Sequence, residues 1–178
     1  MVKSGAKWLE LENIFVILNF QIENDFSMTT FIGDFICKID TKGRISFPSV
    51  FKKQINSSVK DTFILKKDIF ENCLIIYRND EWEKQINLIR EKINPYKKEH
   101  NIFIRGFYKD TAEVTLDSNN RLLIPKRLLD MLKIENEVYL VGLDSKIEIW
   151  AVEQYEKTSQ KEDDFAALAE KILGNDNK

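Results

Sequence analysis

The chain contains the same sequence unit twice, and this duplication constrains the fold more than any other feature. The segment CKIDTKGRISFPSVFKKQI (37–55) aligns without a gap with VTLDSNNRLLIPKRLLDML (114–132). The alignment resumes downstream after a small shift, where CLIIYRNDEWEK (73–84) matches KIEIWAVEQYEK (146–157). Two matching blocks in the same order indicate a tandem duplication, so we expect two equivalent units packed around a common core.

The two copies share turn-forming positions as well as apolar ones. Apolar residues fall at matching places along both copies, which predicts equivalent buried faces. The identical residues of the first aligned block are Asp40, Arg44 and Pro48 in the first copy and Asp117, Arg121 and Pro125 in the second.

The sequence of each copy predicts a strand, a turn and a second strand, then a helix, two more strands and a closing helix. An alternating strand leads into a tight turn in which Gly43 or Asn120 can adopt the left-handed conformation. A short second strand ends at a proline suited to start a helix. The expected helices are 48–55, 81–93 and 125–132, and the expected strand pairs are 62–67 with 73–77 and 137–142 with 146–150.

These patterns divide the chain into four segments. Residues 1–28 are interpreted as an N-terminal extension outside the core or a mis-assigned start, because Met28 offers an alternative beginning. Residues 29–96 and 97–158 form the first and second units, and residues 159–178 form a C-terminal helix and tail. In that helix apolar residues recur at helical spacing, which requires a partner surface on its own core or on a neighbouring subunit.

Composition excludes several classes of protein. The chain has 178 residues, 43% of them hydrophobic and 31% charged, which predicts a well-packed globular protein. It has one histidine and lacks the common nucleotide-binding, metalloprotease and serine-hydrolase motifs, so we expect no enzyme activity, catalytic residue, metal, cofactor or small-molecule substrate. The longest apolar stretch is far too short to span a bilayer, and no signal peptide is recognised.

Two groups of residues are expected to serve packing rather than chemistry. Cys37 and Cys73 lie in apolar runs without a paired motif, which is typical of reduced, buried thiols in a cytosolic protein. The aromatic residues Trp82, Trp150 and Tyr155 repeat between the copies, which favours core packing over ligand stacking.

Charge is segregated along a nearly neutral chain. The formal net charge is −2, so global charge does not indicate nucleic-acid binding. Basic residues nevertheless predominate in 34–60 and 97–109, whereas 151–178 is acidic. Locally positive turns suit contact with phosphates, and a solvated charged face is the alternative interpretation.

The Asp-to-Arg turns are the best candidates for recognition. Asp40 and Asp117 are interpreted as structural, each capping its turn and pairing with the arginine four residues later. Arg44 is the stronger candidate for an external contact, because other basic residues surround it. The second turn is less basic, since Asn119 and Asn120 replace Lys42 and Gly43 there.

The motifs TTFIGDFICKIDTKGRISFP, LDSNNRLLIP, VGLDSKIEIW and FAALAEKIL together resemble the MraZ family over residues 29–174. The resemblance implies a bacterial DNA-binding transcription regulator with an α+β fold, in which two tandem SpoVT-AbrB-like hairpin and helix units form a mixed β-barrel core with peripheral helices. It also implies a ring, most often an octamer, in the cytoplasm and associated with the nucleoid. Such a ring would bind short direct repeats in double-stranded DNA, usually as a repressor of its own operon of division and cell-wall genes.

The resemblance carries over to individual turn residues. Asn120 stands where the family commonly has glycine, and residues 1–27 have no counterpart in the family. The expected DNA-binding residues are Lys38, Lys42, Arg44, Asn119 and Arg121, and the expected turn-structural residues are Asp40, Gly43, Asp117 and Asn120.

A single turn would bind DNA too weakly for regulation, because each contact contributes about 1–3 kcal/mol. A ring repeats the turn at fixed spacing, so later contacts become intramolecular and affinity rises. Two other interpretations are an AbrB-type antitoxin that binds DNA and a toxin, and an assembly or adaptor protein that does not bind DNA.

Overall fold

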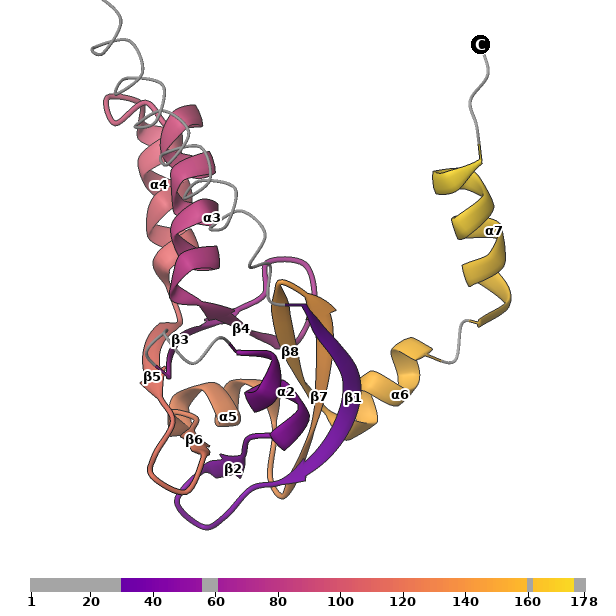
Figure 1. The fold of residues 1–178 in the computed structure, drawn as a ribbon. Helices are drawn as coiled ribbons and strands as arrows, with labels where there is room; N and C mark the ends of the chain where they lie inside the picture. The colour runs from indigo at the N-terminus through magenta and orange to yellow at the C-terminus, as the bar shows by residue number, and fades with distance from the viewer. Residues whose placement is uncertain (1–29, 56–60, 160–161, 175–178) are drawn as a thin grey trace, which may run out of the picture.

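The computed structural model describes residues 30–55, 61–159 and 162–174, so the expectation for residues 1–28 lies outside the described part. The fold is mixed α/β, with one six-stranded sheet, one two-stranded sheet and helices around them (Figure 1). The first copy contributes β1 (Phe31–Lys38), β2 (Arg44–Ser46), α2 (Ser49–Gln54), β3 (Thr62–Lys67), β4 (Leu74–Arg78) and α3 (Asn79–Lys92). The rest of the described chain forms α4 (Lys98–Tyr108), β5 (Thr111–Thr115), β6 (Arg121–Leu123), α5 (Lys126–Leu132), β7 (Glu137–Asp144), β8 (Lys146–Ala151), α6 (Val152–Ser159) and α7 (Glu162–Leu173).

The predicted order of elements is confirmed in both copies. The first copy runs β1, β2, α2, β3, β4, α3, and the second repeats this as β5, β6, α5, β7, β8, α6. Helix α4 was not predicted. It precedes β5 and runs beside α3, so that the two helices project together from one end of the sheet (Figure 1).

The six-stranded sheet has a palindromic strand order, β1-β7-β8-β4-β3-β5. Exchanging each strand for its equivalent in the other copy gives the same order read backwards. The first strand of each copy pairs with the other copy, since β1 lies against β7 and β5 lies against β3. The two copies therefore form one sheet and cannot separate without breaking strand pairs.

The two-stranded sheet connects the two edge strands of the six-stranded sheet. Strand β2 pairs with β6, and bridges join Ile39 to Ile45 and Leu116 to Leu122. These bridges connect the edge strands β1 and β5 to the β2–β6 sheet, which completes a circuit of strand pairs.

The expectation of a mixed barrel is wrong in one respect. All strand pairs of the described residues are antiparallel. Short hairpins join β3 to β4 and β7 to β8, and such connections produce antiparallel neighbours, whereas parallel neighbours need long crossovers. The two hairpins then meet antiparallel, β4 against β8.

The core is equivalent in the two copies. Phe51 of α2 and Leu128 of α5 occupy matching positions, and both side chains are fully buried. The ring of Phe51 lies 5.6 Å from that of Phe31 and 5.0 Å from that of Phe35, in both cases edge to face. Each helix after the second strand therefore packs its apolar face onto the shared sheet.

The residues expected to pack rather than react do so. Trp150 is buried, and Tyr155 packs 4.5 Å from Tyr139, measured between ring centroids. Trp82 stacks on Phe107 of α4 at 5.4 Å. Cys73 is fully buried and burial raises the pKa of its thiol to about 12, whereas Cys37 is half-buried; both are free cysteines.

Candidate nucleic-acid interface

The first candidate turn is organised by the carboxylate of Asp40. Its Oδ1 accepts hydrogen bonds from the backbone N–H of Lys42 and of Arg44, both at 2.9 Å. Its Oδ2 accepts a hydrogen bond from Arg44 Nε at 2.7 Å, and Arg44 Nη2 lies 2.6 Å away from the same oxygen. One carboxylate therefore fixes both the backbone of the turn and the direction of the arginine.

The second turn reproduces this arrangement. Asp117 Oδ1 accepts from the backbone N–H of Asn119 at 2.8 Å and of Arg121 at 2.9 Å. Asp117 Oδ2 accepts from Arg121 Nε at 2.9 Å and lies 2.8 Å from Nη2. The structural interpretation of both aspartates agrees with these contacts.

The pairing lowers the pKa of both turn aspartates. The pKa of Asp40 falls to about 2, mainly through the hydrogen bond from the Arg44 side chain and then through the Arg44 backbone. The pKa of Asp117 is lowered as well, with the Arg121 backbone hydrogen bond as the largest cause. Both carboxylates are therefore charged near neutral pH and hold their arginines.

A left-handed residue stands at the same place in each turn, as the sequence predicted. Gly43 has φ +82° and Asn120 has φ +55°. The carbonyl of Gly43 accepts a hydrogen bond from Ile124 N–H at 3.0 Å, and the carbonyl of Asn120 accepts one from Phe47 N–H at 2.9 Å. Each turn is thus tied to the strand that follows the other turn, a link that no sequence pattern indicates.

The register of β2 against β6 places the two arginines on one face. Arg44 is paired with Leu123, and Arg121 is paired with Ser46. Ile45 and Leu122, paired with each other between these positions, are fully buried. Because side chains alternate across a strand, Arg44 and Arg121 both lie on the outward face of the β2–β6 sheet.

The arginines remain partly accessible although each is paired. The Arg44 side chain is 26% exposed and that of Arg121 is 30% exposed. Lys38, Lys42 and Asn119 are exposed beside them. The candidate surface thus combines two arginines, each paired with an aspartate of its own turn, with exposed polar or basic side chains around them.

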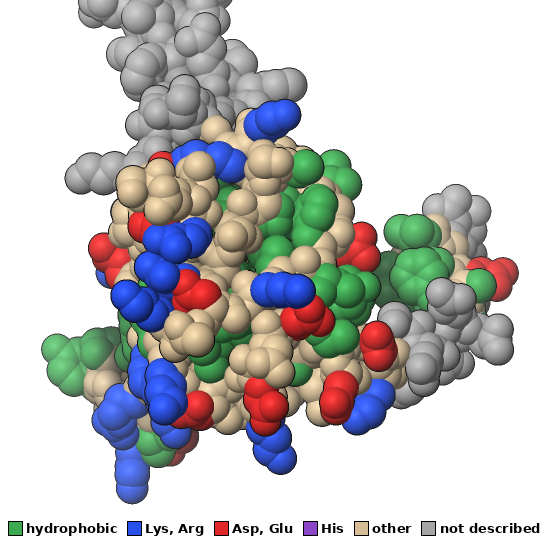
Figure 2. Space-filling model, turned by 90° about the horizontal axis from the view of Figure 1, so that it is seen from below, with side chains coloured by type: hydrophobic (Ala, Val, Ile, Leu, Met, Phe, Trp, Pro, Cys, Tyr) green, Lys and Arg blue, Asp and Glu red, His purple; other side chains and the backbone are tan. Residues whose placement is uncertain are grey.

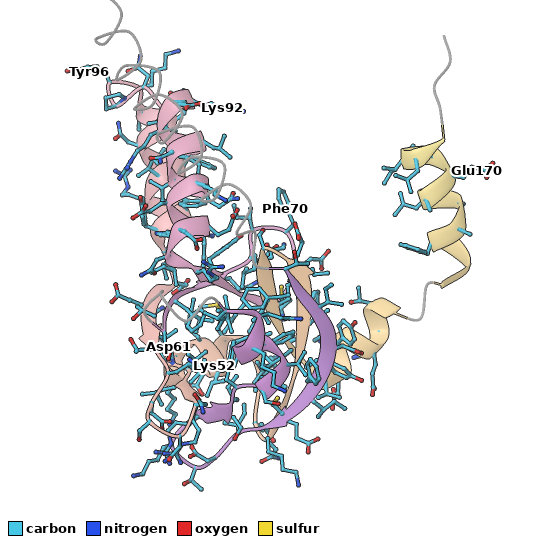
Figure 3. All side chains as sticks on the ribbon, in the orientation of Figure 1. Lys52, Asp61, Phe70, Lys92, Tyr96 and Glu170 are labelled. Carbon is cyan, nitrogen blue, oxygen red and sulfur yellow. The ribbon has the colours of Figure 1, made fainter. Side chains whose placement is uncertain are left out.

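Part of the basic charge counted in the sequence is neutralised locally. Lys52 forms an ion pair with Asp61, and Figure 3 shows these two side chains pointing toward each other. Arg127 forms an ion pair with Asp110 at 2.8 Å. The basic residues of α4 lie on the helical projection, whereas the turns lie at the opposite end of the molecule (Figure 1). Seen from that end, blue side chains gather along one side of the face, with acidic ones between them (Figure 2).

Neither metal-binding clusters nor membrane-spanning helices occur among the described residues. They contain no group of three or more histidine, cysteine or carboxylate side chains able to hold a metal ion. None of the described helices is long and apolar enough to cross a membrane. His100 has a local role, since its Nδ1 accepts a hydrogen bond from the Asn94 backbone at 3.0 Å.

Fold and site together define a chain made of two copies of one antiparallel α/β unit, each carrying the same Asp-to-Arg turn. A family model described as "MraZ protein, putative antitoxin-like" matches residues 30–102 and 107–176. The chain belongs to the MraZ family.

Relatives that carry the family name align with the chain over most of their length. "Transcriptional regulator MraZ" of Christiangramia forsetii is 41% identical over 150 residues, which cover 84% of this chain and 96% of the relative. The protein of the same name from Phocaeicola vulgatus is 40% identical over 147 residues, covering 83% and 96%. That of Bacteroides thetaiotaomicron is 36% identical over 151 residues, covering 85% and 97%.

Proposed function

We propose that the chain is a DNA-binding transcription regulator that contacts double-stranded DNA through its two Asp-to-Arg turns. The observation that carries the proposal is the common outward face of the β2–β6 sheet, from which Arg44 and Arg121 both extend. The name "transcriptional regulator" of its relatives supports the same function.

The proposal also includes the barrel, the ring and the DNA target that the family resemblance implies. The two units, 29–96 and 97–158, are SpoVT-AbrB-like halves of one barrel, followed by the C-terminal segment 159–178. The chain assembles into a ring, most often an octamer, in the cytoplasm and at the nucleoid. It binds short direct repeats upstream of its own operon of division and cell-wall genes and represses that operon.

The geometry of each turn suits contact with an anionic groove. Nε and Nη2 of Arg44 are held by Asp40, so the guanidinium is oriented before DNA arrives and loses little conformational freedom on binding. Lys42 and Lys38 add positive charge that is available to phosphates. In the second turn Arg121 keeps the same orientation, and Asn119 offers hydrogen bonds in place of the lysine charge.

The first turn therefore contributes more electrostatic affinity than the second. The described part of a single chain presents two such turns, and the contacts of two turns are too few for tight binding at physiological salt. Several chains in a ring would engage successive DNA repeats, so affinity depends on how many repeats one duplex contains.

The test is fluorescence anisotropy of the full chain with a labelled duplex from upstream of its own gene. A scrambled duplex and a salt titration accompany it. We expect Lys42→Ala to weaken binding about tenfold or more and to reduce the salt slope by about one for each chain that contacts the duplex. This variant keeps the turn intact, because Asp40 bonds the backbone N–H of residue 42 and not its side chain.

Lys84→Ala is the matched control, since Lys84 is an exposed lysine of α3, 59% exposed at its side chain and remote from the turns. We expect this control to bind as the unaltered chain does. Arg44→Ala and Arg121→Ala should weaken binding further, with circular dichroism confirming that each variant is folded. Equal, weak binding to native and scrambled duplexes that none of these substitutions changes would contradict the proposal and favour an adaptor protein.

A further inference from the structure

One of the side chains on the outward face of the β2–β6 sheet is apolar. The outward residues are Arg44 and Ser46 of β2 and Arg121 and Leu123 of β6, because the residues between them are buried in the core. Leu123 is 51% exposed. An isolated exposed leucine is ordinary on a protein surface. This leucine differs in its place, since it lies beside both of the arginines that are proposed to contact DNA.

Leu123 belongs to the second copy but lies against the turn of the first. The register of β2 with β6 pairs it directly with Arg44. Its Cδ1 atom lies 4.0 Å from the position that a Cβ atom would take on Gly43. The first turn therefore presents the guanidinium of Arg44 and the apolar surface of Leu123 next to each other.

The equivalent position of the other copy is polar. Ser46 aligns with Leu123 in the sequence repeat, is exposed, and pairs with Arg121. The second turn thus has a hydroxyl group where the first has a branched apolar side chain. Both turns carry the same arginine, so the two can read different bases only through neighbouring positions such as this one.

The major groove of DNA offers chemistry that matches the first turn. This groove admits a two-stranded β-ribbon, and β2 with β6 forms an antiparallel ribbon of that kind. Arginine commonly contacts guanine there, and thymine presents a C5-methyl group that apolar side chains contact. Directly opposed Cβ atoms in a sheet lie about 5 Å apart, and successive base pairs are about 3.4 Å apart. Neighbouring side chains of the ribbon therefore reach bases one or two steps from each other.

We propose that Leu123 contacts the C5-methyl group of a thymine in the major groove, one or two base pairs from the base that Arg44 contacts. The inference rests on the proposed function and names one base feature that the first turn reads. A protein partner fits this surface less well, because Leu123 is flanked by the Asp40–Arg44 and Asp117–Arg121 ion pairs. Charged groups are depleted at the centre of protein–protein interfaces.

The experiment compares two forms of the duplex from upstream of the chain's own gene. In the second form every thymine is replaced by deoxyuridine, which keeps the base pairing and the polar groups of thymine and lacks only the methyl group. Fluorescence anisotropy measures the affinity of the full chain for each form. We expect the deoxyuridine duplex to bind about fourfold more weakly or worse, because burial of one methyl group contributes about 0.8 kcal/mol.

Variants at position 123 assign this difference to the leucine. Leu123→Ala removes the apolar surface and should bring the affinity ratio of the two duplexes close to one, whereas Leu123→Met keeps an apolar side chain and should retain the ratio. Leu88→Ala is the matched control, because Leu88 is 55% exposed and lies on α3, away from the turns. We expect it to behave as the unaltered chain does, with circular dichroism confirming that every variant is folded.

Two results would overturn the inference. One is an affinity ratio near one for the unaltered chain, and the other is an equal loss of affinity on deoxyuridine for the unaltered chain and Leu123→Ala. If Lys42→Ala lowers DNA affinity and deoxyuridine has no effect, the proposed function stands and the thymine contact falls. If native and scrambled duplexes bind equally and Lys42→Ala changes nothing, the proposed function falls and the thymine contact falls with it.

Discussion

At the scale of single residues, one aspartate in each turn serves two purposes. Oδ1 of Asp40 holds the backbone and Oδ2 holds Arg44, so the shape of the turn and the direction of the arginine depend on the same charge. The spacing of aspartate and arginine in the sequence indicated this pairing. It could not indicate that both turns face the same side, because that follows from the register of β2 with β6.

This coupling predicts a pH dependence for Asp40→Asn. The pKa of Asp40 is lowered from 3.8 to about 2, so the unfolded carboxylate takes up its proton first as the pH falls. The stability that the charged group contributes is therefore present above about 3.8 and is lost as the pH falls through about 2. The difference in free energy of unfolding between the unaltered chain and Asp40→Asn should shrink across that window.

Urea denaturation at several pH values measures this difference. Asp117→Asn should behave in the same direction, since the pKa of Asp117 is lowered by the equivalent contacts. A difference that stayed constant from neutral pH to about pH 2 would show that the charge of Asp40 is not what stabilises the turn.

At the scale of elements, the short apolar runs repeated in both copies were sufficient to predict the hairpins. The strand at 62–67 has the predicted bounds, and that at 137–142 extends two residues further, to Asp144. Helix α4 was missed because its basic residues made the segment look like a charged surface. Phe103 and Phe107, four residues apart on one helical face, were the available signal. The expectation of mixed strand directions came from the family resemblance, and the sequence offered no check on it, because alternation defines which face is buried and says nothing about the neighbouring strand.

The packing of α4 predicts a large effect for Phe107→Ala. Phe107 is 9% exposed and contacts Trp82, so its removal leaves a cavity between α3 and α4. We expect a loss of about 3 kcal/mol in the free energy of unfolding, measured by urea denaturation. Phe70→Ala is the matched control, because Phe70 is 91% exposed and should change stability by less than about 0.5 kcal/mol. Equal effects of the two substitutions would contradict the packing of α4 against α3.

At the scale of the whole molecule, exchange of first strands makes the two copies interdependent. The first strand of each copy belongs to the half of the sheet formed by the other copy. The sequence repeat predicted that the copies are equivalent. It could not predict the exchange, because the same alternating pattern would suit a strand paired within its own copy.

We therefore expect a single cooperative unfolding transition. Phe51→Ala and Leu128→Ala remove equivalent buried side chains from the two copies, and each should lower the stability of the whole chain by about 2–5 kcal/mol. Far-ultraviolet circular dichroism and tryptophan fluorescence should report coincident transitions for both variants. Two separate transitions, each shifted by only one of the substitutions, would mean that the copies fold independently.

The symmetric strand order of the six-stranded sheet also bears on how the two turns can evolve. In its strand order, the described chain resembles a symmetric pair of equivalent subunits joined into one polypeptide. In a pair encoded by one short gene, any substitution in the turn would appear in both turns at once. A fused gene removes that restriction, and the two turns have already diverged, with lysine and glycine in one and two asparagines in the other. Mutation can thus change the DNA-contacting residues of one turn while the other turn keeps its own.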